Sequence, residues 1–143
     1  MASVDAGNAT GRVQAGTTAP GEVQALLLPA DQRQSCAVVA VPDSAAGFSD
    51  AIGGGLLEEI HQGVHAGCAY CVYADEERAA KGLAPNSRAR ALAARLDWTD
   101  PERLDLFGDL LVVGAETPGR DTDVPLAVLG AAARAGIVRP RTP

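Results

Sequence analysis

Short apolar runs, separated by glycine, proline and polar turns, recur along the sequence. VQALLL (23–28) and CAVVAV (36–41) are both rich in strand-forming residues, and a polar segment joins them. This pattern predicts an antiparallel hairpin. After it, Asp43 or Ser44 is expected to cap a short helix, which the glycine triplet at 53–55 ends.

A second hairpin is predicted over LLEEIHQ (56–62) and GCAYCVYA (67–74), with its turn at 63–67. Successive side chains of a strand point to opposite faces, so the second strand should present two sets of residues. One set is Cys68, Tyr70 and Val72, and the other is Ala69, Cys71 and Tyr73.

The rest of the chain predicts two longer helices and one strand. Asn86 follows a proline and suits the N-cap of a helix over 87–96. LLVV (110–113) is typical of a short buried strand. Asp123 is expected to cap the last helix. The apolar stripe of that helix is predicted to be Leu126, Leu129 and Ala133.

The predicted order is ββα-ββα-βα, which indicates an α+β fold: a small, mostly antiparallel sheet packed by two to three helices on one side. Residues 1–21 are rich in Gly, Ala and Thr without periodicity, so we expect a flexible N-terminal tail. A single α+β domain is expected over 22–138, followed by a disordered tail at 139–143.

Composition and charge narrow the functional classes. The chain of 143 residues is 47% hydrophobic with 3% aromatic residues, so its core should consist of Leu, Val, Ile and Ala. A net charge of −6 argues against broad, non-specific phosphate binding. No signal peptide or membrane span is apparent. Three cysteines are too few for a disulfide framework, so a cytoplasmic location is expected. Because no membrane span is apparent, we expect no membrane partner.

A His/Cys string in the second hairpin raises the alternative of a zinc protein. His61, His65, Cys68 and Cys71 have zinc-ligand chemistry. Strand alternation, however, turns Cys68 and Cys71 to opposite faces. We therefore expect no cofactor and no catalytic residue. Zinc remains an alternative if the hairpin turn folds back to bring His61, His65 and Cys68 together.

Charge is densest where an acidic turn leads into a basic segment. Separation of charge of this kind is typical of a recognition surface. The predicted binding surface consists of Asp75, Glu76, Glu77, Arg78, Lys81, Asn86, Arg88 and Arg90. A protein partner is the leading expectation. Nucleic acid, bound through the helix 87–96, is an alternative, although no interleaved aromatics suggest base stacking.

Six segments resemble a small domain-of-unknown-function family of actinobacterial phages and plasmids. They are VQALLLPAD (23–31), GGGLLE (53–58), VYADEE (72–77), KGLAPNSRARAL (81–92), GDLLVVG (108–114) and DTDVP (121–125). The resemblance covers 23–135 and implies a compact, cytoplasmic, non-enzymatic accessory domain of a mobile element. The sequence therefore predicts a small accessory or regulatory protein that binds another macromolecule.

Overall fold

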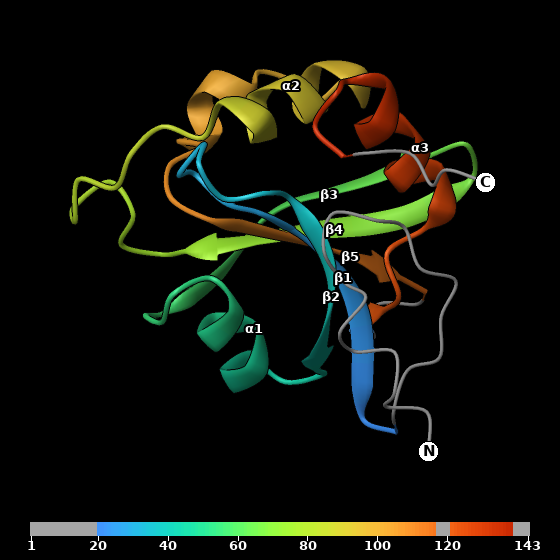
Figure 1. The fold of residues 1–143 in the computed structure, drawn as a ribbon, viewed down its shortest axis with the longest axis horizontal. Coiled ribbons are helices and arrows are strands. Elements are labelled where there is room, and N and C mark those ends of the chain that lie inside the picture. Colours follow the sequence, from blue (N-terminus) through green and yellow to red (C-terminus); the bar gives the residue numbers. More distant parts are fainter. Residues whose placement is uncertain (1–19, 117–120, 139–143) are drawn as a thin grey trace.

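The computed structural model describes residues 20–116 and 121–138. The expected tails at 1–21 and 139–143 lie outside this range, apart from residues 20 and 21. The elements follow in the order β1 (Glu22–Leu28), β2 (Ala37–Pro42), α1 (Ala45–Ala51), β3 (Leu57–His65), β4 (Cys68–Asp75), α2 (Ser87–Arg95), the 3-10 helix η2 (Pro101–Leu104), β5 (Leu110–Ala115), β6 (Asp121–Thr122) and α3 (Leu126–Arg134) (Figure 1). In the described residues no helix has the length and apolar character of a membrane span.

The strands form one antiparallel sheet in the order β2-β1-β5-β4-β3, with β6 beside β5. Both predicted hairpins are confirmed as β1–β2 and β3–β4. The predicted buried strand is β5, which lies between β1 and β4 and pairs Val112 with Leu26 and Val72. The α+β class with a mostly antiparallel sheet is therefore confirmed.

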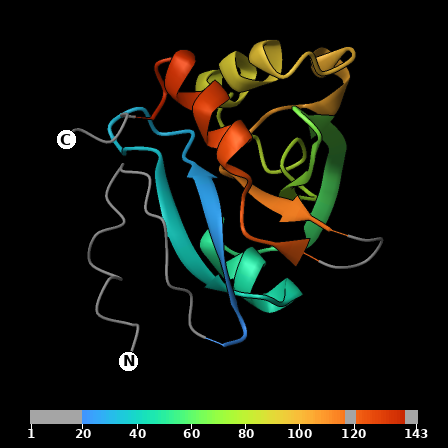
Figure 2. The ribbon, with the colours of Figure 1, turned by 90° about the vertical axis from the view of Figure 1, so that its right-hand side faces the viewer.

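Helices cover both faces of this sheet, so the expectation of helices on one side was wrong. In Figures 1 and 2, α2 and α3 lie on one side of the sheet and α1 lies on the other. Leu26 and Val112 pack with α2 and α3 in the larger core. Phe48 of α1 packs with Leu111 and Val113 in a second core. Neighbouring residues of β5 thus serve opposite cores, which explains its continuous apolar run.

The predicted N-caps of α1 and α2 are confirmed. The Ser44 side chain accepts a hydrogen bond of 3.0 Å from the Gly47 amide. The Asn86 side chain accepts one of 2.9 Å from the Ala89 amide. The glycine triplet ends α1 as expected, since 53–55 all have positive φ.

The second hairpin turns later than predicted. Strand β3 continues to His65, so the turn consists of Ala66 and Gly67 and does not extend over 63–67. Both turn residues have positive φ, 51° and 79°, as a tight two-residue hairpin turn requires. The longer strand moves His61 opposite Val72 and His65 opposite Cys68.

Helix α3 departs from its prediction at two points. Asp123 does not cap it: Pro125 occupies the N-cap position, and Asp123 accepts a 2.8 Å hydrogen bond from the Gln24 amide. The apolar stripe is also rotated, because Leu126 is 70% exposed. The buried residues are Val128, Leu129, Ala131 and Ala132. Asp121 and Thr122, which were not predicted as a strand, form the short strand β6.

Candidate functional site

The acidic turn after β4 is only partly exposed. Glu76 and Glu77 face solvent, but Asp75 is 4% exposed. Its carboxylate accepts hydrogen bonds from Lys81 Nζ at 2.6 Å and from the Glu77 amide at 2.9 Å. The hydrogen bond from Lys81 lowers the pKa of Asp75. Asp75, predicted as part of an exposed binding surface, is therefore buried, and Lys81 compensates its charge.

Arg78 is buried and joins three parts of the chain. Its guanidinium donates a 2.8 Å hydrogen bond to Glu58 Oε1 on β3. It also donates to the backbone carbonyls of Asp75, Leu104 and Asp105, at 2.6–3.0 Å. With 7% exposure, Arg78 stabilises the packing of the turn against η2 and offers little surface to a partner.

Asn86 and Arg88 are held from within the molecule as well. Asn86 is 1% exposed, and its side-chain amide donates to the carbonyls of Leu28 and Gly108. Arg88 is half-buried. Its guanidinium donates to three carbonyls of the turn between β1 and β2, those of Pro29, Asp31 and Gln34. Asn86 therefore holds the start of α2 against β1 and the residues before β5, and Arg88 holds it against the turn between β1 and β2.

Among the described residues, positive charge without a carboxylate partner lies at the C-terminal ends of α2 and α3. Arg90 pairs with Glu102 at 2.5 Å and keeps 45% of its side chain exposed. Arg95 and Arg134 are exposed, and neither has a carboxylate within 4.0 Å among the described residues. Arg95 donates to the Arg134 carbonyl at 3.0 Å, so the two arginines meet where the helices adjoin.

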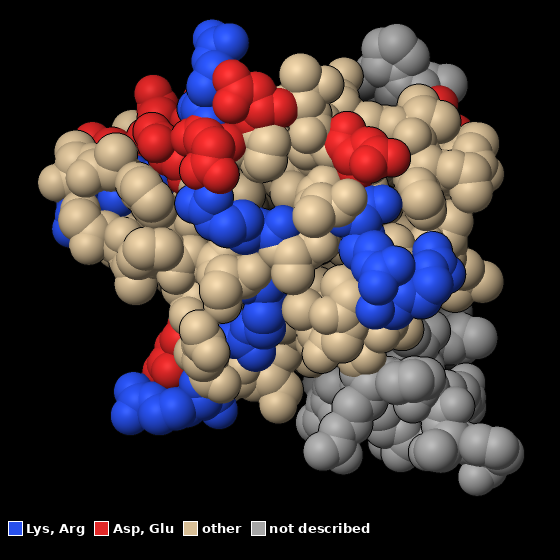
Figure 3. All heavy atoms as spheres, turned by 90° about the horizontal axis from the view of Figure 1, so that it is seen from above, with Lys and Arg blue, Asp and Glu red and all other residues tan. Residues whose placement is uncertain are grey.

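The outer side of α3 extends this basic area. Leu126, Gly130 and Arg134 are spaced i, i+4, i+8 and therefore lie along one side of the helix. A Cβ on Gly130 would lie 3.4 Å from Arg134 Nη1, so the guanidinium rests close to Gly130. We call Arg90, Arg95, Arg134 and Leu126 the arginine face. Figure 3 looks down on this helical layer and shows groups of Lys and Arg side chains over it, with Asp and Glu side chains gathered mainly towards one edge of the view.

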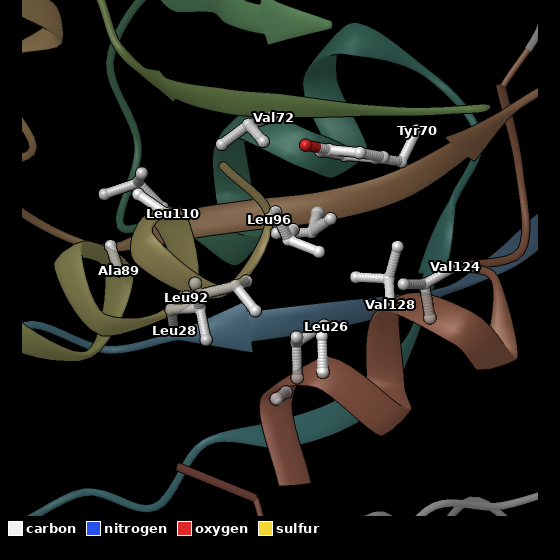
Figure 4. Close-up of a cluster of buried hydrophobic side chains, with 14 of the residues drawn as sticks. Leu26, Leu28, Tyr70, Val72, Ala89, Leu92, Leu96, Leu110, Val124 and Val128 are labelled. Carbon is white, nitrogen blue, oxygen red and sulfur yellow. The ribbon is translucent and has the colours of Figure 1, made fainter. Parts of the chain in front are cut away.

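The His/Cys string is divided between different environments. The His61 ring stacks on Trp98 with 4.5 Å between centroids, and its Nε2 lies 3.3 Å from the Tyr70 hydroxyl. Burial lowers the pKa of His61. Tyr70 and Val72 point into the core under α2 (Figure 4), whereas Cys71 belongs to the core under α1.

Within residues 20–116 and 121–138, no group of three or more His, Cys, Asp and Glu side chains is arranged to hold a metal ion. The zinc alternative on His61, His65, Cys68 and Cys71 therefore finds no ligand set there. This alternative required the hairpin turn to fold back. The turn does not do so, because the two strands stay paired up to His65 and Cys68.

A separate cavity of about 440 Å³ lies on the α1 side of the sheet. There the Tyr73 hydroxyl donates to both Asp121 carboxylate oxygens, at 3.0 and 3.1 Å. The Cys71 thiol donates to the same carboxylate at 3.4 Å. Burial raises the pKa of Cys71 to about 12 and also raises that of Tyr73. The thiol is therefore protonated at neutral pH and is a poor nucleophile. The prediction did not include this cluster, because 48 residues separate Tyr73 from Asp121.

Comparison with known proteins adds a likeness in fold. No family model matches the sequence, and no curated protein matches it significantly. Among solved structures, the crystal structure of the small RNA methyltransferase HEN1 is similar, with a TM-score of 0.54 and 14% sequence identity. The match covers 78% of this chain but 16% of the HEN1 chain. At this identity the likeness concerns the fold alone.

Proposed function

We propose that the protein is a small cytoplasmic accessory protein that binds an acidic protein partner through the arginine face. The main support is that Arg95 of α2 and Arg134 of α3 lie next to each other, and that neither has a carboxylate within 4.0 Å in the described residues. Guanidinium groups bind carboxylates with two parallel hydrogen bonds, and arginine is enriched at protein interfaces. An acidic segment would supply the missing counter-charges.

The neighbouring apolar residue supports a protein as the partner. Leu126 is 70% exposed at the start of α3, on the same side of the helix as Arg134. An exposed leucine on the same side of the helix as an arginine matches the mixture of apolar anchor and polar rim found at protein interfaces. Nucleic acid fits less well, because tight phosphate binding relies on many cations and this chain has a net charge of −6.

We propose a contact surface that differs in part from the one predicted from the sequence. Arg78, Asn86 and Arg88 are bound to backbone carbonyls, so their replacement would disturb folding. These three residues position α2, while Arg90, Arg95 and Arg134 contact the partner. Glu76 and Glu77 remain exposed.

The proposal is tested by affinity capture from an extract of the source organism, followed by quantitative mass spectrometry. The bait is the full chain or its variant Arg95→Glu/Arg134→Glu. The control is Arg33→Glu/Arg103→Glu, which makes the same charge change at side chains that are 91% and 82% exposed. Circular dichroism establishes that each bait is folded.

We expect a partner that the full chain and the control recover equally, and that the Arg95/Arg134 variant recovers at least about tenfold less, which corresponds to about 1.4 kcal/mol. Nuclease treatment of the extract should leave this recovery unchanged. Equal recovery by all three baits would refute the proposal. Recovery that disappears with nuclease would assign the arginine face to nucleic acid instead.

A further inference from the structure

The cavity on the α1 side of the sheet is lined by carboxylates together with aromatic and aliphatic side chains. Its volume of about 440 Å³ falls in the range of small-molecule sites. Four separate parts of the chain line it: the start of α1, β3, β4 and β6. The lining residues are Asp43, Ser44, Ala45, Phe48, Leu57, Tyr73 and Asp121.

The two carboxylates of this cavity have no cationic partner in the described residues. Within residues 20–116 and 121–138, the Asp121 carboxylate accepts hydrogen bonds from the Tyr73 hydroxyl and the Cys71 thiol alone, which are both neutral donors. Asp43 forms no ion pair within 4.0 Å in residues 20–116 and 121–138. By contrast, Asp75 on the same strand as Tyr73 is neutralised by Lys81. The cavity therefore keeps negative charge that a ligand can compensate.

Aromatic and apolar groups line the remainder. The rings of Phe48 and Tyr73 lie with their centroids 5.2 Å apart and are tilted by 39°. The faces of aromatic rings attract organic cations, and this attraction strengthens when the cation loses water. Leu57 and Ala45 add aliphatic surface. A hard metal ion would prefer several oxygen ligands and no aromatic wall.

We propose that this cavity binds an organic cation, an ammonium or guanidinium group carried on a short apolar stem. Asp121 and Asp43 pair with the charged group, and Phe48, Tyr73 and Leu57 contact the stem. Tyr73 and Cys71 hold the Asp121 carboxylate in place through their hydrogen bonds. The cavity is independent of the arginine face, since α1 and α3 lie on opposite sides of the sheet (Figure 1).

The test is a titration of the ¹⁵N-labelled full chain, followed by amide resonances. The probes are n-butylammonium and n-butylguanidinium, with n-butanol as a neutral probe of similar shape. A capped Gly-Lys-Gly peptide tests whether the cation belongs to a free amine or to a side chain of another protein. We expect both cations to shift the resonances of the lining residues saturably, and n-butanol to bind at least about tenfold more weakly.

Variants of the two cavity carboxylates test which negative charge contributes to cation binding. Asp121→Asn and Asp43→Asn should each weaken n-butylammonium binding at least about fivefold, since each removes one counter-charge. Asp50→Asn is the matched control, because Asp50 is an exposed carboxylate of α1 that does not line the cavity. Asp43 is itself exposed, so its variant keeps the test valid if Asp121→Asn fails to fold.

Three outcomes would overturn the proposal: no saturable shift with either cation, equal affinity for n-butanol, or equal weakening by Asp50→Asn. Binding of the free amines alone, or tighter binding of the lysine peptide, would each support it and identify the source of the cation. Arg95→Glu/Arg134→Glu should leave this titration unchanged, so the outcome is separate from that of the partner-capture experiment.

Discussion

The indole N–H of Trp98 donates a 2.7 Å hydrogen bond to the hydroxyl of Tyr70, and both residues are buried. The bond joins the segment after α2 to β4 inside an otherwise apolar core. The His61 ring stacks on Trp98 from the outer side. Gly63 leaves room for the phenol, because a Cβ there would lie 2.6 Å from the Tyr70 hydroxyl oxygen. This is a specific polar contact between elements distant in sequence.

Replacing Tyr70 by Phe should destabilise the protein without changing its fold. The variant keeps the ring but leaves the buried Trp98 N–H without its acceptor, which costs about 1–3 kcal/mol. Urea unfolding followed by circular dichroism measures this loss. In a double-mutant cycle, Trp98→Phe and Tyr70→Phe should show a coupling of at least about 0.5 kcal/mol. Strictly additive effects would mean that the hydrogen bond contributes nothing to stability.

His61 should make stability depend on pH near neutrality. Burial lowers its pKa in the folded state below the ordinary value of 6.5, so the unfolded chain binds the proton more readily. Stability is therefore complete above about pH 6.5 and falls as the pH drops through the folded-state pKa. We expect His61→Phe, which retains the stacking on Trp98, to flatten this slope in urea unfolding measured from about pH 7.5 to pH 5.

The second histidine of the chain serves as the control for this prediction. His65 lies at the end of β3, next to the hairpin turn. His65→Gln should leave the slope of the parent protein in place. If His65→Gln flattened the slope and His61→Phe did not, the assignment of the pH dependence to His61 would be wrong.

Features governed by near neighbours were predictable from the sequence. The caps Ser44 and Asn86 act on amides three residues ahead, so their sequence context contains the whole signal. The two faces of β4 followed from strand alternation, and Tyr70 and Cys71 do lie in different cores. The α+β class followed from the same local patterns.

Features governed by distant partners were not predictable. Asp123 suited an N-cap, but its partner is the Gln24 amide, 99 residues away. Arg78 was placed on a binding surface, yet its acceptors lie on β3 and at the end of η2. A charged side chain has the same sequence signature in solvent and in a satisfied buried site, so only the tertiary structure separates the two cases.

Removal of Arg78 should reveal its structural role. Arg78→Met keeps much of the aliphatic stem but removes the guanidinium donor from Glu58 and from the carbonyls of Asp75, Leu104 and Asp105. The carbonyls of Asp75 and Asp105 keep backbone donors, the amides of residue 78 and Phe107, so the main losses are at Leu104 and Glu58. We expect a loss of at least about 2 kcal/mol in the free energy of unfolding. Arg103→Met is the control, since Arg103 is 82% exposed and its ion pair is long at 3.8 Å. A similar, small effect of both variants would restore Arg78 as a candidate surface residue.

Gly55 and Gly54 offer a matched pair that tests the ion pair between the buried Asp75 and the partly exposed Lys81. Both glycines have positive φ, 103° and 92°, so alanine is strained at either position by about 1–3 kcal/mol. A Cβ on Gly54 meets nothing within 4 Å. A Cβ on Gly55 would lie 2.7 Å from Asp75 Oδ2 and 2.9 Å from Lys81 Nζ, so at least one of these two groups must shift. Gly55→Ala should therefore destabilise the protein more than Gly54→Ala at neutral pH.

The pH dependence of this difference identifies its cause. The hydrogen bond from Lys81 lowers the pKa of Asp75 below its ordinary value of 3.8, so the stabilisation is complete above about pH 4 and is lost as the pH falls through the folded-state pKa. In urea unfolding, the free energies of unfolding of the parent and of Gly55→Ala should approach each other as the pH falls below about 4. Protonation of Asp75 then removes from the parent the ion-pair stabilisation that the substitution has already removed. The gap between the parent and Gly54→Ala reflects backbone strain and should stay constant. If both gaps respond to pH alike, the extra cost at Gly55 is steric and does not arise from the ion pair.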